Sequence, residues 1–530
     1  VAKADLNYTR QKKDYLKTEQ KFYQLLSSLD FLPNSPTLMN AGTKTPQLAA
    51  CFVLPIEDTL DSIFQTLHQT AIIHKYGGGT GFNFSSLRSQ DAFIEETGGK
   101  SSGPVSFIKV FDCATEQIKQ GGKRRGANMA ILRIDHPDIE DFITCKQKNE
   151  ISNFNFSVAV TDQFIHALQK KKPFYLIDPH TQKKTKKDPQ RLFSLLCQAA
   201  WQTGDPGIIF IDTINKHNPT PKQKIDATNP CGEQPLLPYE SCNLGSINLA
   251  NHVTDGQIDW EKLRNTAHDA VHFLDNVIDL SDYIFPKIEE VTKQNRKIGL
   301  GVMGFADMLI RLNNSYSSPE AVKIAENVME FISFEATAAS QHLAEIRGAF
   351  PNFKESTHKK PQRNATLTTI APTGSLSIIA GCSSSIEPLF ALAYTRKMLG
   401  KRIITEINQD LLKMFKQRRL GNKRIINRIS KQGSMRGIEE LPPYLRKIFA
   451  TALEVNPGQH LAVQAAFQKH TDNAVSKTIN LPQNTTVKEV EKIFLTAHRL
   501  GCKGLTVYRY GSKEEQVLTF GCKICDEVKK

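Results

Sequence analysis

The sequence lacks any hydrophobic run long enough to cross a membrane. No window approaches the roughly 18 to 20 consecutive apolar residues that a transmembrane helix needs. The first residues, Val1–Leu6, contain neither an initiator Met nor the apolar core of a secretion signal, so we expect a truncated N-terminus. Internal repeats and low-complexity segments are also absent. These absences exclude a membrane-spanning helix and a repeat architecture.

Cysteine is too sparse for a disulfide-rich scaffold. The chain has 10 cysteines in 530 residues, irregularly spaced and without a secretion signal. Such usage is typical of a reducing compartment, where individual cysteines are catalytic or buried rather than bridged. We therefore expect a cytoplasmic protein.

Basic residues outnumber acidic ones, but no single basic cluster dominates. The chain has 68 Lys and Arg against 54 Asp and Glu, a formal net charge of +14. The surplus lies in short runs such as Lys170–Lys172, and no run is interleaved with the aromatic residues of a nucleic-acid platform. We expect solvated surface lysines, with no stable nucleic-acid partner and no membrane partner. Its length of 530 residues allows two to four domains or one large α/β barrel, and 40% apolar residues are typical of a globular protein.

The apolar pattern predicts helices alternating with strands. Helices are expected at residues 4–30, 58–76, 258–285 and 318–348, with a mostly helical stretch at 401–455. Strands are expected at 51–55, 298–303, 366–371 and 505–508, and a glycine-rich turn at 77–84 feeds another. Asp58 or Asp61 is expected to cap the helix at 58–76. Alternation as far as about residue 250 favours an α/β architecture.

Three cysteines stand in a chemically informative setting. Cys231 lies between a carboxamide and a carboxylate in Asn229-Pro-Cys-Gly-Glu233. Cys242 follows shortly after, and Cys51 lies far upstream in an apolar run. A lone buried cysteine is usually an inert small hydrophobe. The company of Asn229 and Glu233 instead favours a reaction that needs one reactive sulfur, an acid/base and a two-electron dithiol.

This set resembles the active site of ribonucleotide reductase, and more narrowly that of the adenosylcobalamin-dependent class II. The similarity extends over most of the chain, in the same order along it. The matching stretches are Ser35–Gly42, the strand around Cys51, Gly77–Gly81, Gly121–Asn128, Asn229–Leu249 and Ala371–Pro388.

The resemblance implies a ten-stranded α/β barrel of two antiparallel five-stranded halves. A finger loop carrying Cys231 would thread its centre. It also implies that Cys231 becomes a thiyl radical that abstracts the 3′-hydrogen, and that Cys51 and Cys242 form a disulfide in each turnover. Glu233 would be the general base and Asn229 would orient the substrate hydroxyls.

We divide the chain into an N-terminal helical segment (1–30), the catalytic barrel (31–515) and a flexible redox tail (516–530). The activity implied is reduction of ribonucleotides, favouring diphosphates, to 2′-deoxyribonucleotides for DNA synthesis.

The turn Pro372-Thr-Gly-Ser375 precedes an apolar helix, so its backbone N–H groups can meet a phosphate. The alternative is a generic helix N-cap. By family position, further substrate contacts are expected at Thr37, Ala50, Gly78 and Gly79.

The basic loop at 121–126 is a solvated turn or, by resemblance, the link between effector binding and substrate choice. The expected effector contacts, for deoxynucleoside triphosphates at a homodimer interface, are Asp58, Arg88, Lys123, Arg124 and Arg125.

The tail carries Cys522-Lys-Ile-Cys525. One interpretation is that these two cysteines are half of a zinc site, but no second Cys/His pair lies nearby in the sequence. A redox shuttle that re-reduces Cys51–Cys242 and then meets thioredoxin or glutaredoxin fits better. No other metal site is predicted. The remaining cysteines are expected to be structural: Cys113, Cys145, Cys197, Cys382 and Cys502.

The radical source distinguishes the remaining alternatives. Class I catalytic subunits use adjacent tyrosines near the last strand, whereas here Arg509 separates Tyr508 from Tyr510. The chain shows no glycyl-radical signature and no Asp-x-His-x-x-Gly motif, so we expect base-on adenosylcobalamin. A class I large subunit that needs a metal-containing partner and an inactive nucleotide-binding fragment remain as alternatives.

Overall fold

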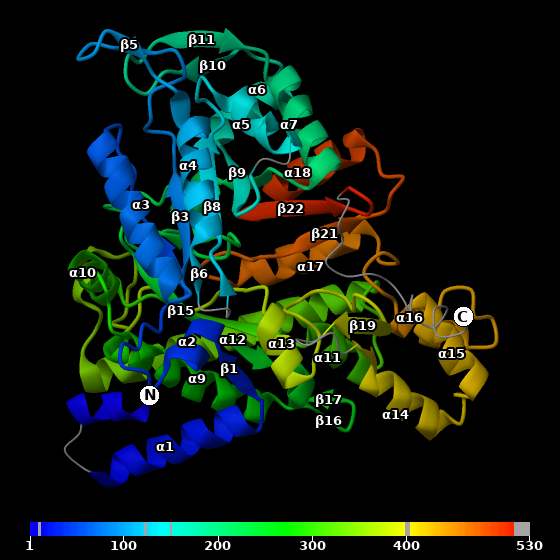
Figure 1. Ribbon diagram of the computed structural model, residues 1–530. Coiled ribbons are helices and arrows are strands. Elements are labelled where there is room, and N and C mark those ends of the chain that lie inside the picture. The colour runs from blue at the N-terminus through cyan, green and yellow to red at the C-terminus, as the bar shows by residue number, and fades with distance from the viewer. Residues whose placement is uncertain (9–11, 121–123, 149–150, 398–402, 513–530) are drawn as a thin grey trace.

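The computed structural model describes residues 1–8, 12–120, 124–148, 151–397 and 403–512, and its centre is one mixed sheet (Figure 1). Within these residues ten strands pair into that sheet. The strands are β1 (Phe31–Pro33), β2 (Cys51–Val53), β3 (Gly79–Asn83), β8 (Asn128–Arg133), β9 (Phe154–Val160), β12 (Gly207–Phe210), β15 (Ser241–Asn248), β18 (Ile298–Met303), β21 (Thr478–Leu481) and β22 (Gly504–Arg509).

The sheet consists of parallel groups that meet through antiparallel pairs. Strands β2, β3, β8, β9 and β12 are parallel in that order. At one end β2 pairs antiparallel with β15, and at the other end β12 pairs antiparallel with β22. Strand β15 is parallel to β18, and β21 is parallel to β22. This mixed α/β sheet confirms the predicted fold class at that level of detail.

The segment expected as a strand at 366–371 forms isolated bridges instead. Leu300 bridges Thr368, and Ile370 bridges Val475, both in parallel orientation. The ladder is interrupted because the Asp472 carboxylate accepts the N–H groups of Leu367 and Thr368, at 2.8 and 3.3 Å. The two bridges nevertheless connect the β18 side of the sheet to the chain entering β21.

Helices cover the outer faces of the sheet (Figure 1). They are α1 (Lys12–Ser27), α2 (Ser35–Asn40), α3 (Leu60–Lys75), α4 (Gly103–Gln117), α5 (Ile139–Thr144), α6 (Asp162–Lys170), α7 (Pro189–Thr203), α8 (Ile211–Lys216), α9 (Trp260–Leu280), α10 (Pro286–Asn295), α11 (Phe305–Arg311), α12 (Pro319–Arg347), α13 (Gly374–Ala380), α14 (Gln409–Arg418), α15 (Lys423–Gln432), α16 (Pro443–Ile448), α17 (Pro457–Lys469) and α18 (Val487–Arg499). Short 3₁₀ helices are η1 (Ala2–Asn7), η2 (Cys145–Lys148), η3 (Leu249–His252) and η4 (Pro351–Glu355).

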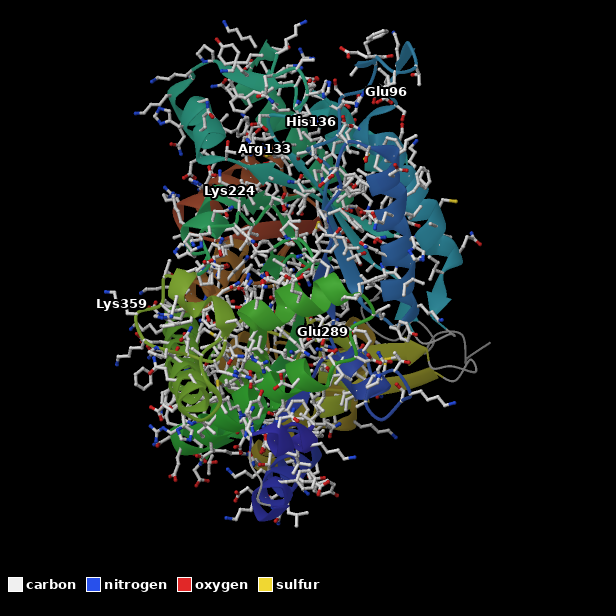
Figure 2. All side chains as sticks on the ribbon, turned by 90° about the vertical axis from the view of Figure 1, so that its left-hand side faces the viewer. Glu96, Arg133, His136, Lys224, Glu289 and Lys359 are labelled. Atoms are coloured by element: carbon white, nitrogen blue, oxygen red, sulfur yellow. The ribbon has the colours of Figure 1, made fainter. Side chains whose placement is uncertain are left out.

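The described residues also contain six two-stranded antiparallel hairpins. They are β4–β5 (Phe93–Ile94, Gly99–Lys100), β6–β7 (Lys119–Gln120, Arg124–Arg125), β10–β11 (Phe174–Ile177, Lys184–Lys187), β13–β14 (Ala227–Thr228, Pro235–Leu236), β16–β17 (Val253–Thr254, Gln257–Ile258) and β19–β20 (Ala393–Lys397, Ile403–Ile407). In Figure 2, Arg133, at the end of β8, and His136 lie toward the same end of the molecule as Glu96 of the β4–β5 turn. The carboxyl ends of the parallel strands therefore face the end of the molecule that carries the β4–β5 turn. Among these described residues, no helix is both long and apolar enough to span a bilayer.

Three expected details of the helices are corrected. Thr59, rather than Asp58 or Asp61, caps α3, because its side chain accepts the N–H of Ser62 at 3.2 Å. The stretch at 401–455 begins with strand β20 before its three helices, because Ile403–Ile407 pairs with β19. The expected helix at 4–30 is divided into η1 and α1.

Residues alternate between two apolar environments along the central strands. On β8, Ala130 and Leu132 pack outward against the helices, whereas Met129 and Ile131 face a separate inner cluster. On β18, Ile298, Leu300 and Val302 pack outward. This period of two follows from the pleat of a strand. The inner face of the sheet is where the predicted site residues gather.

Candidate active site

The motif around Cys231 forms the tip of the β13–β14 hairpin. Ala227 pairs with Leu236 and Thr228 with Pro235. The Asn229 N–H donates to the Gln234 carbonyl at 3.1 Å, and the Gln234 N–H donates to the Asn229 carboxamide oxygen at 3.0 Å. These bonds close the loop tightly and leave Cys231 exposed at its tip.

Glycines on two strands make room for this loop. A Cβ at Gly79 would lie 2.8 Å from Pro230, and one at Gly81 would lie 1.7 Å from the Thr228 carbonyl oxygen. Across the sheet, a Cβ at Gly299 would lie 2.6 Å from the Gln234 side chain. Because side chains alternate along a strand, glycine at these inner positions lets the loop contact β3 and β18 at once.

The hairpin belongs to one inner apolar cluster with residues from five strands. These residues are Ala50, Cys51, Val53, Met129, Ile131, Ala159, Ile209, Ile211, Ile214, Ile225, Ala227, Leu236, Leu237, Cys242, Leu244 and Ala371. The Asn155 side chain of β9 also donates to the Pro230 carbonyl at 2.8 Å. The loop therefore contacts strands that lie far apart in the sequence.

We expect Gly81→Ala to lower the free energy of unfolding by about 3 kcal/mol and to impair activity, because the new methyl group overlaps the Thr228 carbonyl. Urea denaturation followed by circular dichroism measures the stability. Gly99→Ala is the matched control, since its nearest neighbour is the flexible Thr97 hydroxyl at 3.3 Å. An unchanged unfolding midpoint for Gly81→Ala would contradict this account of the loop.

Cys51 and Cys242 face each other across the antiparallel pair of β2 and β15. Residues directly opposite in such a pair have Cα atoms about 4.5–5.5 Å apart, within the range of a disulfide. Both side chains are buried, at 4% and 1% exposure, and both are free thiols. Burial raises the pKa of each thiol, and the charge of Glu233 raises that of Cys51 further. The geometry suits a two-electron dithiol.

The Asn229–Glu233 loop is joined directly to the dithiol. The Asn229 carboxamide donates to the Cys51 sulfur at 3.1 Å. Glu233 is buried, and its carbonyl accepts from the Thr369 hydroxyl at 2.8 Å and from the Ala474 N–H at 2.9 Å. The structure thus brings together all five predicted catalytic residues.

Three predicted substrate contacts, Ala50, Gly78 and Gly79, lie beside the strand that carries Cys51. The Ala50 N–H donates to the Cys242 carbonyl at 3.1 Å, and the Ala50 carbonyl accepts from Gly79 at 2.8 Å. Gly78 packs against Phe52, which leaves no room for a side chain. Thr37 is buried in α2, and its hydroxyl donates to the Leu48 carbonyl at 2.9 Å.

The predicted phosphate turn lies at the end of the segment that carries Ala371. Thr373 has a positive φ of 53° and its hydroxyl accepts from the Ser385 N–H at 2.7 Å. Gly374 and Ser375 are exposed at the start of α13, as is Pro372 before them. The turn is open to solvent, as a phosphate contact requires.

The predicted effector residues are only partly described. The Arg88 guanidinium pairs with the Asp58 carboxylate at 2.7 Å, and the Arg88 N–H donates to the same carboxylate at 3.0 Å. Arg124 and Arg125 form β7, whereas Lys123 lies outside the described residues. Cys522 and Cys525 also lie outside the described residues.

Sequence reasoning missed several groups of this site. Asn155, Thr369 and the buried pair Glu240–Lys297 carry no local motif. The signal that was available is the Gly-x-Gly spacing of Gly79/Gly81 and Gly299/Gly301, which marks a close approach of another chain segment.

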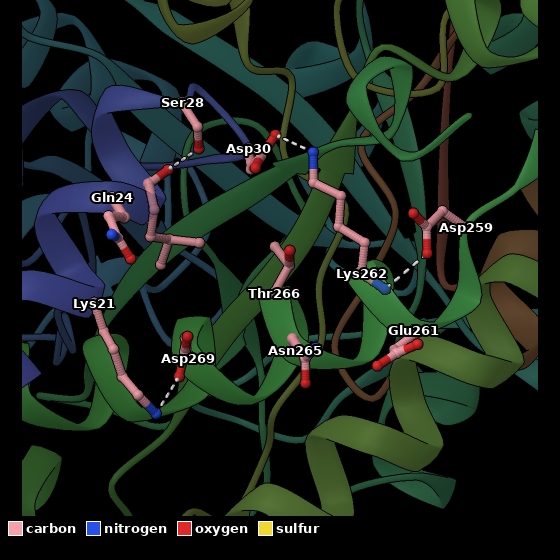
Figure 3. A pocket seen from close by; sticks show the side chains of 11 residues that line it. Lys21, Gln24, Ser28, Asp30, Asp259, Glu261, Lys262, Asn265, Thr266 and Asp269 are labelled. Carbon is pink, nitrogen blue, oxygen red and sulfur yellow. Dashed lines mark hydrogen bonds and ion pairs between the residues drawn. The ribbon is translucent and has the colours of Figure 1, made fainter. Parts of the chain in front are cut away.

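The polar groove between α1 and α9 lies elsewhere (Figure 3). It has a volume of about 540 Å³, and Lys21–Asp269 and Lys262–Asp30 ion pairs cross it at 3.6 and 3.0 Å. None of the predicted site residues lines it. Within the described part of the chain, no group of three or more His, Cys, Asp or Glu side chains could hold a metal ion.

Comparison with known proteins agrees with this geometry. A family model described as ribonucleotide reductase, barrel domain, matches residues 49–362 and 357–508, and one described as ribonucleotide reductase, all-alpha domain, matches residues 1–46. A vitamin B12-dependent ribonucleoside-diphosphate reductase of Thermoplasma acidophilum is 50% identical over 94% of this chain and 66% of its own length. A protein of the same name from Mycobacterium tuberculosis is 49% identical over 94% and 72%.

A solved structure gives the same result for the fold. The alpha subunit of a class Id ribonucleotide reductase of Actinobacillus ureae has a TM-score of 0.80 and 25% identity, over 96% of this chain and 92% of its own. The chain spans about two thirds of the Thermoplasma relative. The resemblance to cobalamin-dependent members is confirmed by relatives that share half of its residues. This chain belongs to the ribonucleotide reductase family.

Proposed function

We propose that this chain reduces ribonucleotides, as diphosphates, to 2′-deoxyribonucleotides by thiyl-radical chemistry, with adenosylcobalamin as radical source. The observation that carries the proposal is one tight loop holding Cys231 and Glu233 beside the facing pair Cys51 and Cys242. Relatives that share half of its residues bear the name of that activity.

Each group of the loop and the pair has one step to perform. The Cys231 thiyl radical would take the 3′-hydrogen, and Glu233 would take the 3′-hydroxyl proton. The 2′-oxygen would then leave as water. Cys51 and Cys242 would supply two electrons and two hydrogens and form a disulfide, while the hydrogen on Cys231 returns to C3′. The sum is ribonucleotide plus dithiol to deoxyribonucleotide, water and disulfide.

A closed barrel with a central finger loop is the architecture that we propose around this site. The bridges at Thr368 and Ile370 support closure, because they continue the pairing from β18 to β21. The contacts of the 229–234 loop with β3, β9 and β18 support its central position. One half of the barrel would contain the parallel strands β2, β3, β8, β9 and β12. The other half would contain β15, β18, β21 and β22, and the two halves would run antiparallel to each other.

The substrate phosphates would bind the exposed turn Pro372–Ser375, where free N–H groups begin α13. Thr37, Ala50 and the glycines at 78 and 79 would line the ribose. We assign no residue to the base of the substrate.

The residues at the loop tip fit a cobalamin radical source. The Cys231 thiol is exposed, so a radical group can approach it directly. Ile378 and Ile379 of α13 are 53% and 54% exposed and offer apolar surface beside the phosphate turn. When bound, adenosylcobalamin would supply a radical by homolysis of its cobalt–carbon bond. The B12-dependent names of the relatives favour this source over a class I partner protein.

The remaining roles rest on the resemblance. Deoxynucleoside triphosphate effectors would bind near the Asp58–Arg88 pair at a homodimer interface, with Lys123, Arg124 and Arg125 carrying the response. The tail (516–530), through Cys522 and Cys525, would re-reduce the disulfide and exchange with thioredoxin or glutaredoxin. The cytoplasm supplies such reductants.

The proposed function predicts product without a second protein. The purified chain, incubated with adenosylcobalamin, dithiothreitol, CDP and a deoxynucleoside triphosphate, is expected to form dCDP, measured by chromatography. The same mixture without adenosylcobalamin is the control. A folded chain that forms no product from CDP or CTP would contradict self-sufficient cobalamin-dependent reduction.

A further inference from the structure

After α13 the chain folds back against the predicted phosphate turn. The Ser385 N–H donates to the Thr373 hydroxyl at 2.7 Å, and the Ser384 and Ser377 hydroxyls are hydrogen-bonded at 2.9 Å. We call residues 383–387 the return segment. Its contacts hold the turn and the first part of α13 in place, including the positive φ of 53° at Thr373.

One end of the return segment is anchored to the start of α11. The Asp307 carboxylate accepts the Ser383 N–H at 2.5 Å, and the Gly304 N–H donates to the Ser383 carbonyl at 2.8 Å. Asp307 is buried, with 5% exposure. This end of the segment therefore keeps a fixed place where β18 leads into α11.

The other end is anchored by a buried lysine. The Glu387 carboxylate pairs with the Lys477 ammonium, and it accepts the N–H of Thr478, the first residue of β21, at 2.9 Å. The Lys477 side chain has 0% exposure. Its ammonium also donates to the His460 ring at 3.0 Å and to the Thr478 carbonyl at 3.2 Å, so all three of its hydrogens are used.

The histidine of this group has a defined tautomer. Its Nε2 lies 3.0 Å from the Ala452 carbonyl, which can only accept, so Nε2 carries the hydrogen. Its Nδ1 therefore accepts from the Lys477 ammonium. Every donor around Lys477 has an acceptor, so the ammonium has one orientation and the Glu387 carboxylate is held by it.

The segment that carries Lys477 also holds the Asn229–Glu233 loop. Three residues before the lysine, the Ala474 N–H donates to the Glu233 carbonyl at 2.9 Å. Three residues of chain span at most about 10 Å. The lysine that anchors the return segment therefore lies within a short and limited distance of the loop that carries the predicted base.

We propose that Glu387 and Lys477 are positioning residues that hold the phosphate turn at a fixed distance from the Asn229–Glu233 loop. This proposal rests on the proposed function, in which the turn binds the substrate phosphates and the loop acts on the ribose. Ribose and diphosphate are covalently joined, so both are engaged at once only when the two sites keep that distance. The two residues act through the return segment.

The first test is amide hydrogen exchange, measured by mass spectrometry without nucleotide or cobalamin. The Glu387→Gln side chain has the same size but no charge, so the charge-assisted bond to Lys477 is lost. We expect peptides covering 374–387 to exchange at least about tenfold faster than in the starting protein, because the return segment opens more often. Peptides of α6 are expected to be unchanged.

Matched variants separate the anchor from the buried charge. Glu387→Leu/Lys477→Met replaces the pair by apolar side chains, which such buried sites often tolerate. We expect this double variant to fold and to show the same faster exchange, because the bond to the Thr478 N–H is gone. Lys469→Met, on α17, breaks an exposed pair with Glu326 and is expected to leave the exchange unchanged.

The second test is CDP binding to the same proteins, measured by calorimetry. We expect the Kd for CDP to rise at least about tenfold in Glu387→Gln and in the double variant, because phosphates and ribose no longer reach their sites together. Lys469→Met is expected to keep the Kd within about twofold. A purely structural role would lower the unfolding midpoint and leave the CDP affinity of the folded protein unchanged.

Unchanged exchange at 374–387, in whichever of the two variants folds, would overturn the proposal. An unchanged Kd for CDP in that variant would overturn it as well. The exchange measurement needs no nucleotide, so it decides on the anchoring of the turn even when the starting protein binds no CDP. That last outcome would contradict the proposed function, and the two failures are therefore distinguishable.

Discussion

Replacing Cys231 by serine is expected to abolish deoxyribonucleotide formation and to leave the fold unchanged. Cys231 is exposed at the tip of a loop closed by Asn229 and Gln234, so the hydroxyl fits where the thiol stood. The O–H bond of serine is much stronger than an S–H bond, so the radical step cannot occur. We expect the rate to fall by at least about 10⁴-fold, the scale seen when a reacting group of a cooperating set is lost.

The measurement is dCDP formation under the conditions that support the unchanged chain. Circular dichroism and the unfolding midpoint confirm that Cys231→Ser is folded. Cys113→Ser, at an exposed cysteine of α4, is the matched control and is expected to keep full activity. A Cys231→Ser variant that retains a tenth of the activity would remove Cys231 from the chemistry.

Replacing Asp275 by alanine is expected to cause the largest loss of stability. This carboxylate has 0% exposure and lies among three guanidinium groups. It pairs with Arg296 at 2.8 Å, with Arg347 at 2.9 Å and with Arg363 at 3.3 Å. Burial opposes its ionisation, yet these guanidinium groups hold its pKa below the ordinary value. The carboxylate is therefore charged at neutral pH.

Without Asp275 the buried positive charges lose their common partner. We expect the free energy of unfolding to fall by about 3–5 kcal/mol, as is usual when one partner of a buried ion pair is removed. Urea denaturation measures the change. Glu290→Gln, which removes an exposed pair with Lys287, is the control and should change stability by less than about 1 kcal/mol. Equal effects of the two substitutions would show that the network is not a stabilising core of the fold.

Local sequence patterns were sufficient to predict the long helices and most of the expected strands. The period of apolar residues predicted α9 and α12 closely, because each helix buries one face against the same core. The alternation at 298–303 and 505–508 predicted β18 and β22. The strand at 366–371 was less regular than expected, because Asp472, a residue far away in the sequence, accepts its N–H groups.

The residues of the candidate site were also predictable only in part from the sequence. The residue types around Cys231 indicated the chemistry, because few reactions need a lone thiol, a carboxylate and a dithiol together. The partners Glu240 and Lys297 were not predicted, since each has the appearance of an ordinary surface charge in the sequence. They meet only because β15 and β18 pair in parallel and bury the ends of both strands.

By itself, the sequence determined the helical periodicity and the chemistry of the Cys231 motif, which depend on local residue patterns, and the family resemblance, which depends on the order of several motifs along the chain. Only the tertiary structure decided the strand register that places Cys51 opposite Cys242, the contact of Asn229 with the Cys51 sulfur, and the glycines that make room for the loop. The reason is register. The packing of the whole sheet decides which residues of two distant strands stand opposite each other. No local sequence pattern determines this register.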